Sequence, residues 1–129
     1  VVSSDLVLDG RADLLVVEKE SGDDRQRDGQ IRLIRNLTPQ GNNGIGLHLN
    51  AQVGRPIWGA RVRVHQVDGV TQELPVVTGD SWKAQHGTSL HFGLGKNKVA
   101  QLEVIWSNGK VSRVDQPAVN QYHTLKDSK

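Results

Sequence analysis

The segment from Val104 to Lys110 constrains the fold more than any other part of the chain. A strand pattern that ends at Trp106 is followed by Ser107-Asn108-Gly109, after which a second alternating pattern begins. An Asn-Gly pair between two such patterns is a strong hairpin signal, because both residues accept the positive φ angles of a tight turn. The segment therefore predicts two antiparallel strands joined by a short turn.

Other segments between residues 45 and 125 have the same strand character. In one of them Ile45, Leu47 and Leu49 alternate with polar or small residues, and in another Val62 and Val64 do so. The predicted strands are residues 45–51, 60–67, 72–77, 88–92, 99–106, 110–115 and 121–125. Glycine-rich and Asp-Gly turns separate them, among them the string Gly93-Leu94-Gly95. About seven short strands without a helical period predict an all-β fold, either a β-sandwich or a partly open barrel.

A further pair of strands precedes this region. Residues 13–18 predict a buried strand, with Leu14 to Val17 apolar, and residues 30–35 predict its hairpin partner. A lone hairpin is not stable in water, so this one must pack on something. The polar, turn-rich residues 36–44 separate the two regions. We therefore divide the chain into an N-terminal part, residues 1–40, and a β-domain, residues 41–129.

Composition excludes several classes of function. The first 30 residues hold eight acidic and four basic residues, and the net charge of the whole chain is +2. The basic residues are scattered along the strands, which argues against nucleic-acid binding. Cysteine is absent, so there are neither disulfides nor thiolate sites. No apolar run approaches the roughly 18 residues of a membrane span. The chain starts at Val1, and we expect it to be a processed product or an excised piece.

Three strings in the β-domain, taken together, resemble the ASPIC/UnbV family. They are Gly59-Ala60-Arg61-Val62-Arg63-Val64, Leu90-His91-Phe92-Gly93-Leu94-Gly95 and Leu102-Glu103-Val104-Ile105-Trp106-Ser107-Asn108-Gly109-Lys110. The N-terminal string from Asp5 to Leu14 resembles the calcium loop of an FG-GAP repeat, the blade unit of integrin-like β-propellers. The resemblance implies that residues 1–40 are the remnant of a propeller blade and that residues 41–129 form the terminal domain.

The FG-GAP resemblance makes Asp5, Asp9 and Asp13 the candidate metal ligands, with the backbone carbonyl of Arg11. Calcium loops place oxygen ligands at alternate positions around a glycine turn. Val7 departs from this pattern, because it offers no side-chain oxygen. The alternative is a degenerate turn in which the aspartates accept hydrogen bonds from backbone amides. Calcium is the one cofactor that the sequence suggests.

No catalytic residue is assigned. The histidines lack the spacing of a zinc site; His48 and His65 are expected on solvent faces, and His91 is expected to pack structurally. Trp106 is expected in the core. Trp82, Lys83 and His86 form the candidate ligand site, because an exposed tryptophan among polar side chains suits a sugar or protein partner. The alternative is that Trp58 and Trp82 cap the open ends of the sandwich.

The family resemblance, with no catalytic residue assigned, implies a non-enzymatic extracellular interaction or adhesion module attached to a β-propeller. Two alternatives stay open: a carbohydrate-binding accessory domain of a larger secreted enzyme, and a structural cap on the propeller. The expected partner is an extracellular protein or a glycan, with neither nucleic acid nor a membrane span. The resemblance implies a secreted, periplasmic or cell-surface location. The sequence does not define the oligomeric state.

Overall fold

The computed structural model describes residues 1–7, 9, 11–18, 29–39, 41–52, 54–79, 85 and 87–127. The regular elements in this part of the chain are ten β-strands, which form three sheets. No described sheet closes into a barrel. The all-β prediction is therefore confirmed, and the arrangement is consistent with a β-sandwich.

The first sheet, here called the N-terminal sheet, has the antiparallel order β1-β2-β3. Its strands are β1 (Val2–Ser4), β2 (Asp13–Glu18) and β3 (Gln30–Ile34). Strands β2 and β3 confirm the predicted hairpin. The sequence does not predict β1, because a three-residue strand is too short to show alternation.

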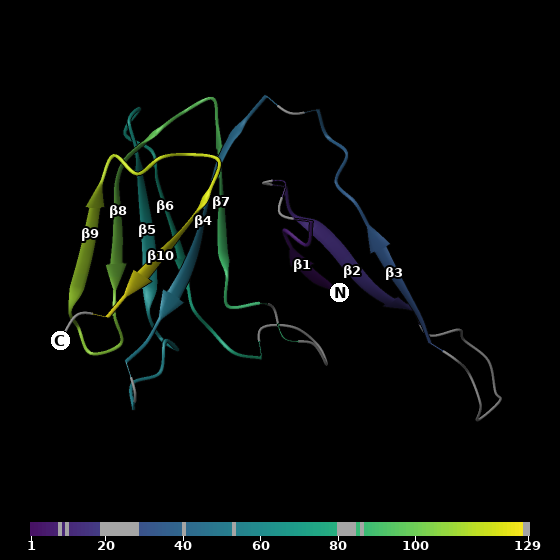
Figure 1. Cartoon of the computed structure of the whole chain (residues 1–129), viewed down its shortest axis with the longest axis horizontal. Helices are drawn as coiled ribbons and strands as arrows, with labels where there is room; N and C mark the ends of the chain where they lie inside the picture. The colour runs from purple at the N-terminus through teal and green to yellow at the C-terminus, as the bar shows by residue number, and fades with distance from the viewer. Residues whose placement is uncertain are drawn as a thin grey trace.

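The other two sheets make up the β-domain (Figure 1). The mixed sheet has the order β10-β4-β7, in which β10 runs parallel to β4 and β7 antiparallel to it. It consists of β4 (Asn43–Asn50), β7 (Leu90–Gly95) and β10 (Tyr122–Lys126). The four-stranded sheet is antiparallel, with the order β6-β5-β8-β9. It consists of β5 (Arg61–Gln66), β6 (Thr71–Pro75), β8 (Val99–Ile105) and β9 (Val111–Asp115).

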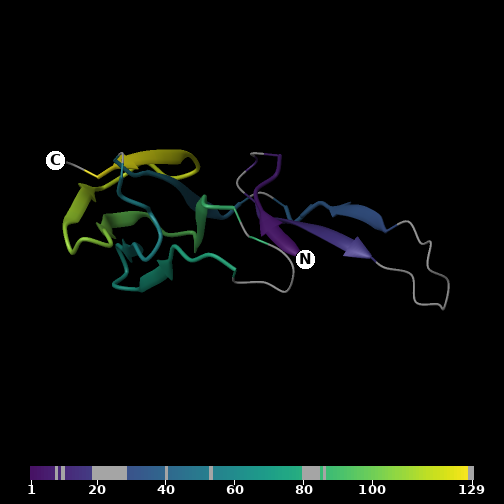
Figure 2. The same cartoon turned by 90° about the horizontal axis from the view of Figure 1, so that it is seen from below.

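One apolar core joins the two sheets of the β-domain. The mixed sheet supplies Ile45, Leu47 and Phe92, and the four-stranded sheet supplies Val62 and Val64 among others. These side chains are almost completely buried, which confirms the alternation that the sequence predicts for β4 and β5. Trp106 is also buried in this core, as expected. Figure 2 shows the two sheets as layers at one end of the molecule, with the N-terminal sheet extending away from them.

The Asn108-Gly109 turn is confirmed. The Gly109 amide donates to the Trp106 carbonyl at 2.9 Å, and the Trp106 amide donates to the Lys110 carbonyl at 2.8 Å. Gly109 has a φ of 82°, in the left-handed region that glycine adopts without strain. The side chain of Asn108 accepts the Lys110 amide at 2.9 Å. Strands β8 and β9 therefore meet where the sequence places the hairpin.

The turn predicted at Gly93-Leu94-Gly95 is wrong, because these residues lie in strand β7. Strand β7 continues to Gly95, because Gly93 and Gly95 pair with Gly44 and Asn43 of β4 across a register shift. Leu94 is buried in the core, which holds this part of the strand against the sheet. Only Gly95 has a positive φ, of 59°. The chain turns after Gly95, not before it.

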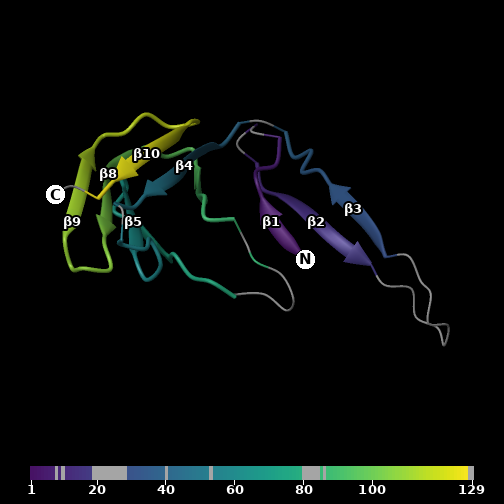
Figure 3. The ribbon, with the colours of Figure 1, turned by 60° about the horizontal axis from the view of Figure 1, so that its bottom comes forward.

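The burial predicted for Leu14 to Val17 is wrong at Leu14 and Val17, whereas Leu15 and Val16 are half-buried. Leu14 and Val17 are exposed, and so is Ile31 on the neighbouring strand. Apolar sequence predicts burial only where another layer covers the side chains, and no described element covers the faces of the N-terminal sheet. Figure 3 shows this sheet beside the β-domain, joined to it by the segment between β3 and β4. The division after residue 40 falls within this segment and stays a prediction.

Candidate functional site

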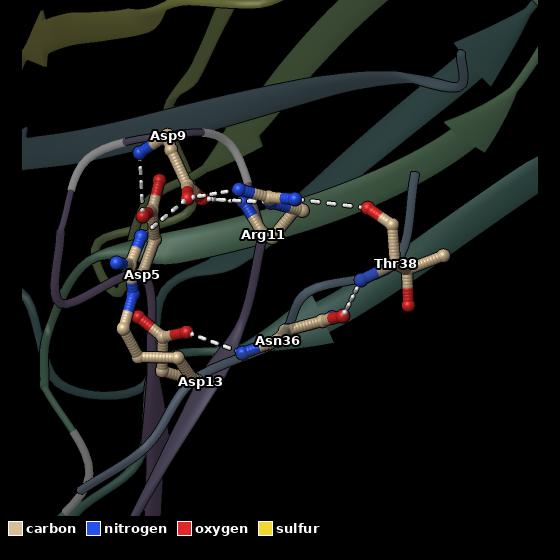
Figure 4. A network of polar contacts seen from close by, with 7 residues as sticks. Asp5, Asp9, Arg11, Asp13, Asn36 and Thr38 are labelled. Carbon is tan, nitrogen blue, oxygen red and sulfur yellow. Dashed lines mark hydrogen bonds and ion pairs between the residues drawn. The ribbon is translucent and has the colours of Figure 1, made fainter. Parts of the chain in front are cut away.

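The acidic loop between β1 and β2 carries the three aspartates predicted to bind metal. Asp5 follows the last residue of β1, and Asp13 is the first residue of β2. Asp13 is only 1% exposed and Asp5 only 5%, so both carboxylates are removed from water. Figure 4 shows them near Asp9 and Arg11, with Asn36 and Thr38 of the segment after β3 on the other side. The structure thus brings the three aspartates together.

The carboxylate of Asp9 is held by Arg11. The Arg11 guanidinium donates from Nε to Oδ1 at 3.1 Å and from Nη2 to Oδ2 at 2.5 Å, and its backbone amide donates to Oδ1 at 3.2 Å. Arg35 adds a weaker ion pair to Asp9 at 3.5 Å. The bond from Arg11 lowers the pKa of Asp9, because it stabilises the charged carboxylate. Asp9 therefore has a cationic partner within the chain.

Asp5 and Asp13 accept backbone amides. The Asp9 amide donates to Asp5 Oδ1 at 3.0 Å, and the Asn36 amide donates to Asp13 Oδ1 at 2.8 Å. These are the bonds expected of the degenerate turn that the sequence leaves as the alternative to a metal loop. Asp13 Oδ2 is buried and has no hydrogen-bond partner among the described residues. Oδ2 is therefore the oxygen of Asp13 that could still accept a hydrogen bond or coordinate a cation.

Few side-chain oxygens of the described loop residues are free to coordinate a calcium ion. Calcium takes six to eight oxygen ligands, whereas the Asp9 oxygens face a guanidinium and Val7 supplies no side-chain oxygen. Among the described residues, no group of three or more histidine, aspartate or glutamate side chains is placed to hold a metal ion. Calcium binding by Asp5, Asp9 and Asp13 stays a prediction.

The acidic loop also contacts the β-domain, through Tyr122. The Tyr122 hydroxyl donates to Asp5 Oδ2 at 3.3 Å. Its ring stacks on His48, with 4.9 Å between centroids, and lies 6.4 Å from the ring of His91. Tyr122 pairs with Gly46 of β4, and its ring occupies the space where a Gly46 side chain would lie. The bond from the Tyr122 hydroxyl thus joins Asp5 to the mixed sheet.

A groove of about 380 Å³ lies between the acidic loop and the β-domain. Asp5, His91 and Tyr122 line it together with residues near the ends of β6 and β7. In the part of the chain that the structure describes, the buried Nδ1 of His91 has no hydrogen-bond partner. A concave site with a few convergent polar groups is the usual form of a ligand site.

No sequence motif marks Tyr122 as a functional residue. Glycine inside a strand marks a close approach of other atoms, and Gly44 and Gly46 in β4 are such a signal. The signal identifies neither the tyrosine nor its partner Asp5, because they lie 117 residues apart in the chain.

The titration of Tyr122 tests this contact. Burial, followed by the charge and hydrogen bond of Asp5, raises the pKa of Tyr122 from 10.0 to about 12. The folded state therefore favours neutral tyrosine; its contribution to stability is complete below pH 10.0 and is lost as the pH rises towards 12. Tyr122 is the single tyrosine of the chain, so phenolate absorbance reports it directly. We expect a midpoint near 12, lowered in Asp5→Asn and unchanged in Asp115→Asn. A wild-type midpoint near 10 contradicts the contact.

The tryptophans and histidines considered in the sequence are placed as follows. Trp82, Lys83 and His86, the candidate ligand site, lie outside the described residues. Trp58 is 39% exposed. His48 is exposed and His65 half-buried on the solvent side of their strands, as expected. His91 is half-buried and packs near Tyr122.

Ser89 and His48 form a pair that resembles part of a hydrolase site. Ser89 Oγ and His48 Nδ1 lie 2.9 Å apart. A nucleophilic serine also needs a third group that orients the histidine and donors that stabilise an oxyanion. Among the described contacts the His48 ring meets Tyr122 instead of a carboxylate. The pair alone therefore does not define a catalytic site.

Comparison with known proteins adds the family. None of the curated proteins searched matches the chain. In the described part of the chain, no helix has the length and apolar character needed to cross a membrane. The ASPIC and UnbV family matches residues 50–129, a range that contains β5 to β10 and begins at the last residue of β4. The match covers more than half of the sequence, so the chain belongs to the ASPIC/UnbV family, an extracellular module family of non-catalytic type.

Proposed function

We propose that this protein is a non-enzymatic extracellular interaction module, held on a β-propeller through its N-terminal sheet. The observation that carries the proposal is that the N-terminal sheet has apolar side chains exposed on both faces. A sheet of this kind has to be covered on two sides to be stable in water.

The strand register shows how the apolar residues divide between the faces. Residues opposite each other in an antiparallel pair point to the same face. Val17 pairs with Ile31 on one face, and these side chains are 66% and 70% exposed. Leu14 pairs with Ile34 on the other face, and both are exposed as well. Each face therefore offers an apolar surface to a covering layer.

In a β-propeller, a sheet is covered on both faces. Blades are small antiparallel sheets arranged around a central channel, so each blade packs against a neighbour on both faces. The antiparallel order β1-β2-β3 suits such a blade, and the Asp5–Leu14 string resembles an FG-GAP repeat. The covering layers would then be the neighbouring blade surfaces, and the β-domain would stand at the edge of the propeller.

A polar substitution on one face tests the proposal. In Val17→Thr/Ile31→Thr, both strands keep residues that favour β-structure. In this chain alone we expect a change in unfolding free energy within about 0.5 kcal/mol, because both side chains are exposed. In the longest natural polypeptide that contains the chain, we expect a loss of about 1 to 3 kcal/mol for each side chain, because the hydroxyls are then buried. Thermal or urea unfolding measures both.

Val67→Thr is the matched control, since Val67 is equally exposed but follows β5 in the β-domain. It is expected to have little effect in either polypeptide. Equal, small effects of the double variant in both polypeptides contradict packing against a propeller. A large loss in the short chain contradicts it too, because the face would already be covered there.

The two alternative functions, a carbohydrate-binding domain and a structural cap, differ in whether they require a further partner. Carbohydrate binding rests on Trp82, Lys83 and His86, and no described contact argues for it. A structural cap shares the propeller contact but requires no further partner. We favour the interaction module, because the groove beside Tyr122 offers a concave, partly polar surface away from the exposed faces of the N-terminal sheet.

A further inference from the structure

We propose that Arg11 is a built-in cation that closes the acidic loop, so that the N-terminal sheet is fixed on the β-domain without a metal ion. The loop concentrates three carboxylates, two of them almost completely buried. Buried carboxylates are stable only when they are hydrogen-bonded or paired with positive charge. A metal ion can supply that charge, and here a guanidinium is in place to supply it.

The position of Arg11 makes it the centre of the loop. Two guanidinium nitrogens contact the two oxygens of Asp9, which is the bidentate geometry that arginine forms with carboxylates. Asp13 and Asp5 also stabilise the positive charge of Arg11, after the dominant contribution of Asp9. Arg11 thus bonds directly to Asp9 and acts on Asp5 and Asp13, the other two predicted metal ligands, through its charge.

The same side chain crosses from the loop to the segment that leads into the β-domain. Arg11 Nη1 donates to the Thr38 carbonyl at 2.9 Å, and the Thr38 amide donates to Asn36 Oδ1 at 3.1 Å. The Asn36 amide in turn donates to buried Asp13. The guanidinium therefore orders the loop and the following segment together.

The second connection runs through Asp5. Its Oδ1 accepts the Asp9 amide, and its Oδ2 accepts the Tyr122 hydroxyl of β10. Arg11 holds Asp9, Asp9 positions Asp5, and Asp5 bonds to Tyr122. Arg11 is thus a positioning residue for the contact between the N-terminal sheet and the mixed sheet.

Calcium response separates this proposal from the calcium prediction of the sequence. For the wild-type chain we expect the same unfolding midpoint and the same Tyr122 pKa in excess calcium and in excess chelator. Stabilisation of the wild type by calcium would overturn the proposal and support the calcium prediction. Neither result bears on the propeller proposal, which depends on the apolar faces of the sheet.

Substitution of Arg11 tests its role directly. In Arg11→Gln we expect the amide protons of Asp9 and Asn36 to exchange about tenfold faster or more, because the charge that orders their acceptors is lost. We also expect Arg11→Lys to recover part of the protection, since it keeps the charge but not the fork. Arg32→Gln is the matched control, because its ion pair with Glu18 is exposed and outside the loop. Unchanged exchange in Arg11→Gln would overturn the proposal.

A gain of calcium binding provides the complementary test. In Val7→Asp/Arg11→Gln the guanidinium is removed and an oxygen ligand is added at the position that lacks one. We expect calcium to raise the unfolding midpoint of this variant and to restore protection of the Asp9 amide. Failure to respond would overturn the idea that Arg11 stands in for a cation. Folding of each variant is checked on the core around Trp106, which contains no residue of the N-terminal sheet.

Discussion

Replacing Gly46 with alanine is expected to displace Tyr122 and separate the acidic loop from the β-domain. A Cβ at residue 46 would lie 2.3 Å from Tyr122 Cδ1 and Cε1 and 2.6 Å from Cγ, closer than real Cβ contacts allow. The ring cannot move away while it stacks on His48 and its hydroxyl bonds to Asp5. We expect the unfolding free energy to fall by about 1 to 3 kcal/mol, as for other overpacked sites.

The measurement is urea unfolding combined with titration of Tyr122. In Gly46→Ala the displaced hydroxyl leaves Asp5, so the pKa of Tyr122 is expected to fall from about 12 towards 10.0. Gly93→Ala is the matched control, because Gly93 lies in β7 of the same sheet and, apart from its own chain neighbours, no described residue has an atom within 4 Å of its Cβ position. Its expected effect is within about 0.5 kcal/mol. Equal effects of the two alanines contradict the close approach of Tyr122.

Replacing Phe92 with alanine is expected to have the largest effect on the stability of the β-domain. Phe92 is 1% exposed, pairs with buried Ile45 of β4, and belongs to the same core as buried residues of β8. Truncation of a buried phenylalanine removes apolar contacts and leaves a cavity, which together cost about 3 to 5 kcal/mol. Such a loss is a large part of the stability of a domain of this size.

Urea unfolding of the whole chain measures this loss. Leu37→Ala is the control, because Leu37 is 73% exposed and lies outside the core. If Phe92→Ala does not fold, Phe92→Leu keeps most of the apolar volume and is expected to lose less than the alanine variant. A loss below about 1 kcal/mol in Phe92→Ala would show that the two sheets do not share this core.

The two substitutions act on different parts of the protein. Phe92 joins the two sheets of the β-domain, whereas Gly46 allows that domain to hold the N-terminal part through Tyr122. The proposed interaction module would need both properties, a stable core and a fixed orientation relative to the N-terminal sheet. The expected phenotype of Gly46→Ala is therefore a folded β-domain with a loosened contact to the N-terminal sheet.

Much of the β-domain could be predicted from its sequence because the relevant signals are local. Alternation places Leu47 and Val64 in the core, and Asn108-Gly109 defines a hairpin. These patterns depend on the two-residue period of a strand and on the conformational freedom of a turn. The match of residues 50–129 to the ASPIC/UnbV family rests on the same part of the chain.

For the acidic loop, the sequence predicts which residue types gather there but not how their charges are balanced. The spacing of Asp5, Asp9 and Asp13 brings attention to the loop, but charge spacing alone does not say whether a metal ion or an arginine balances it. Arg11 entered the sequence-based prediction as a backbone carbonyl, and its side chain proves to hold Asp9. Its bond to the Thr38 carbonyl spans 27 residues and follows from the path of the chain, not from a motif.

The sequence by itself determined that this is an all-β protein, where most of its strands lie and which family it belongs to, because side-chain alternation and turn residues act over a few neighbouring positions. Tertiary structure decided which of these side chains are buried and which distant residues they contact. Leu14 and Val17 look like core residues, yet they are exposed because no described layer covers them. Asp5 and Tyr122 are unremarkable alone and become a pair because β10 lies parallel to β4, beside Gly46. Burial and long-range pairing are properties of packed surfaces, and no local pattern in the chain contains them.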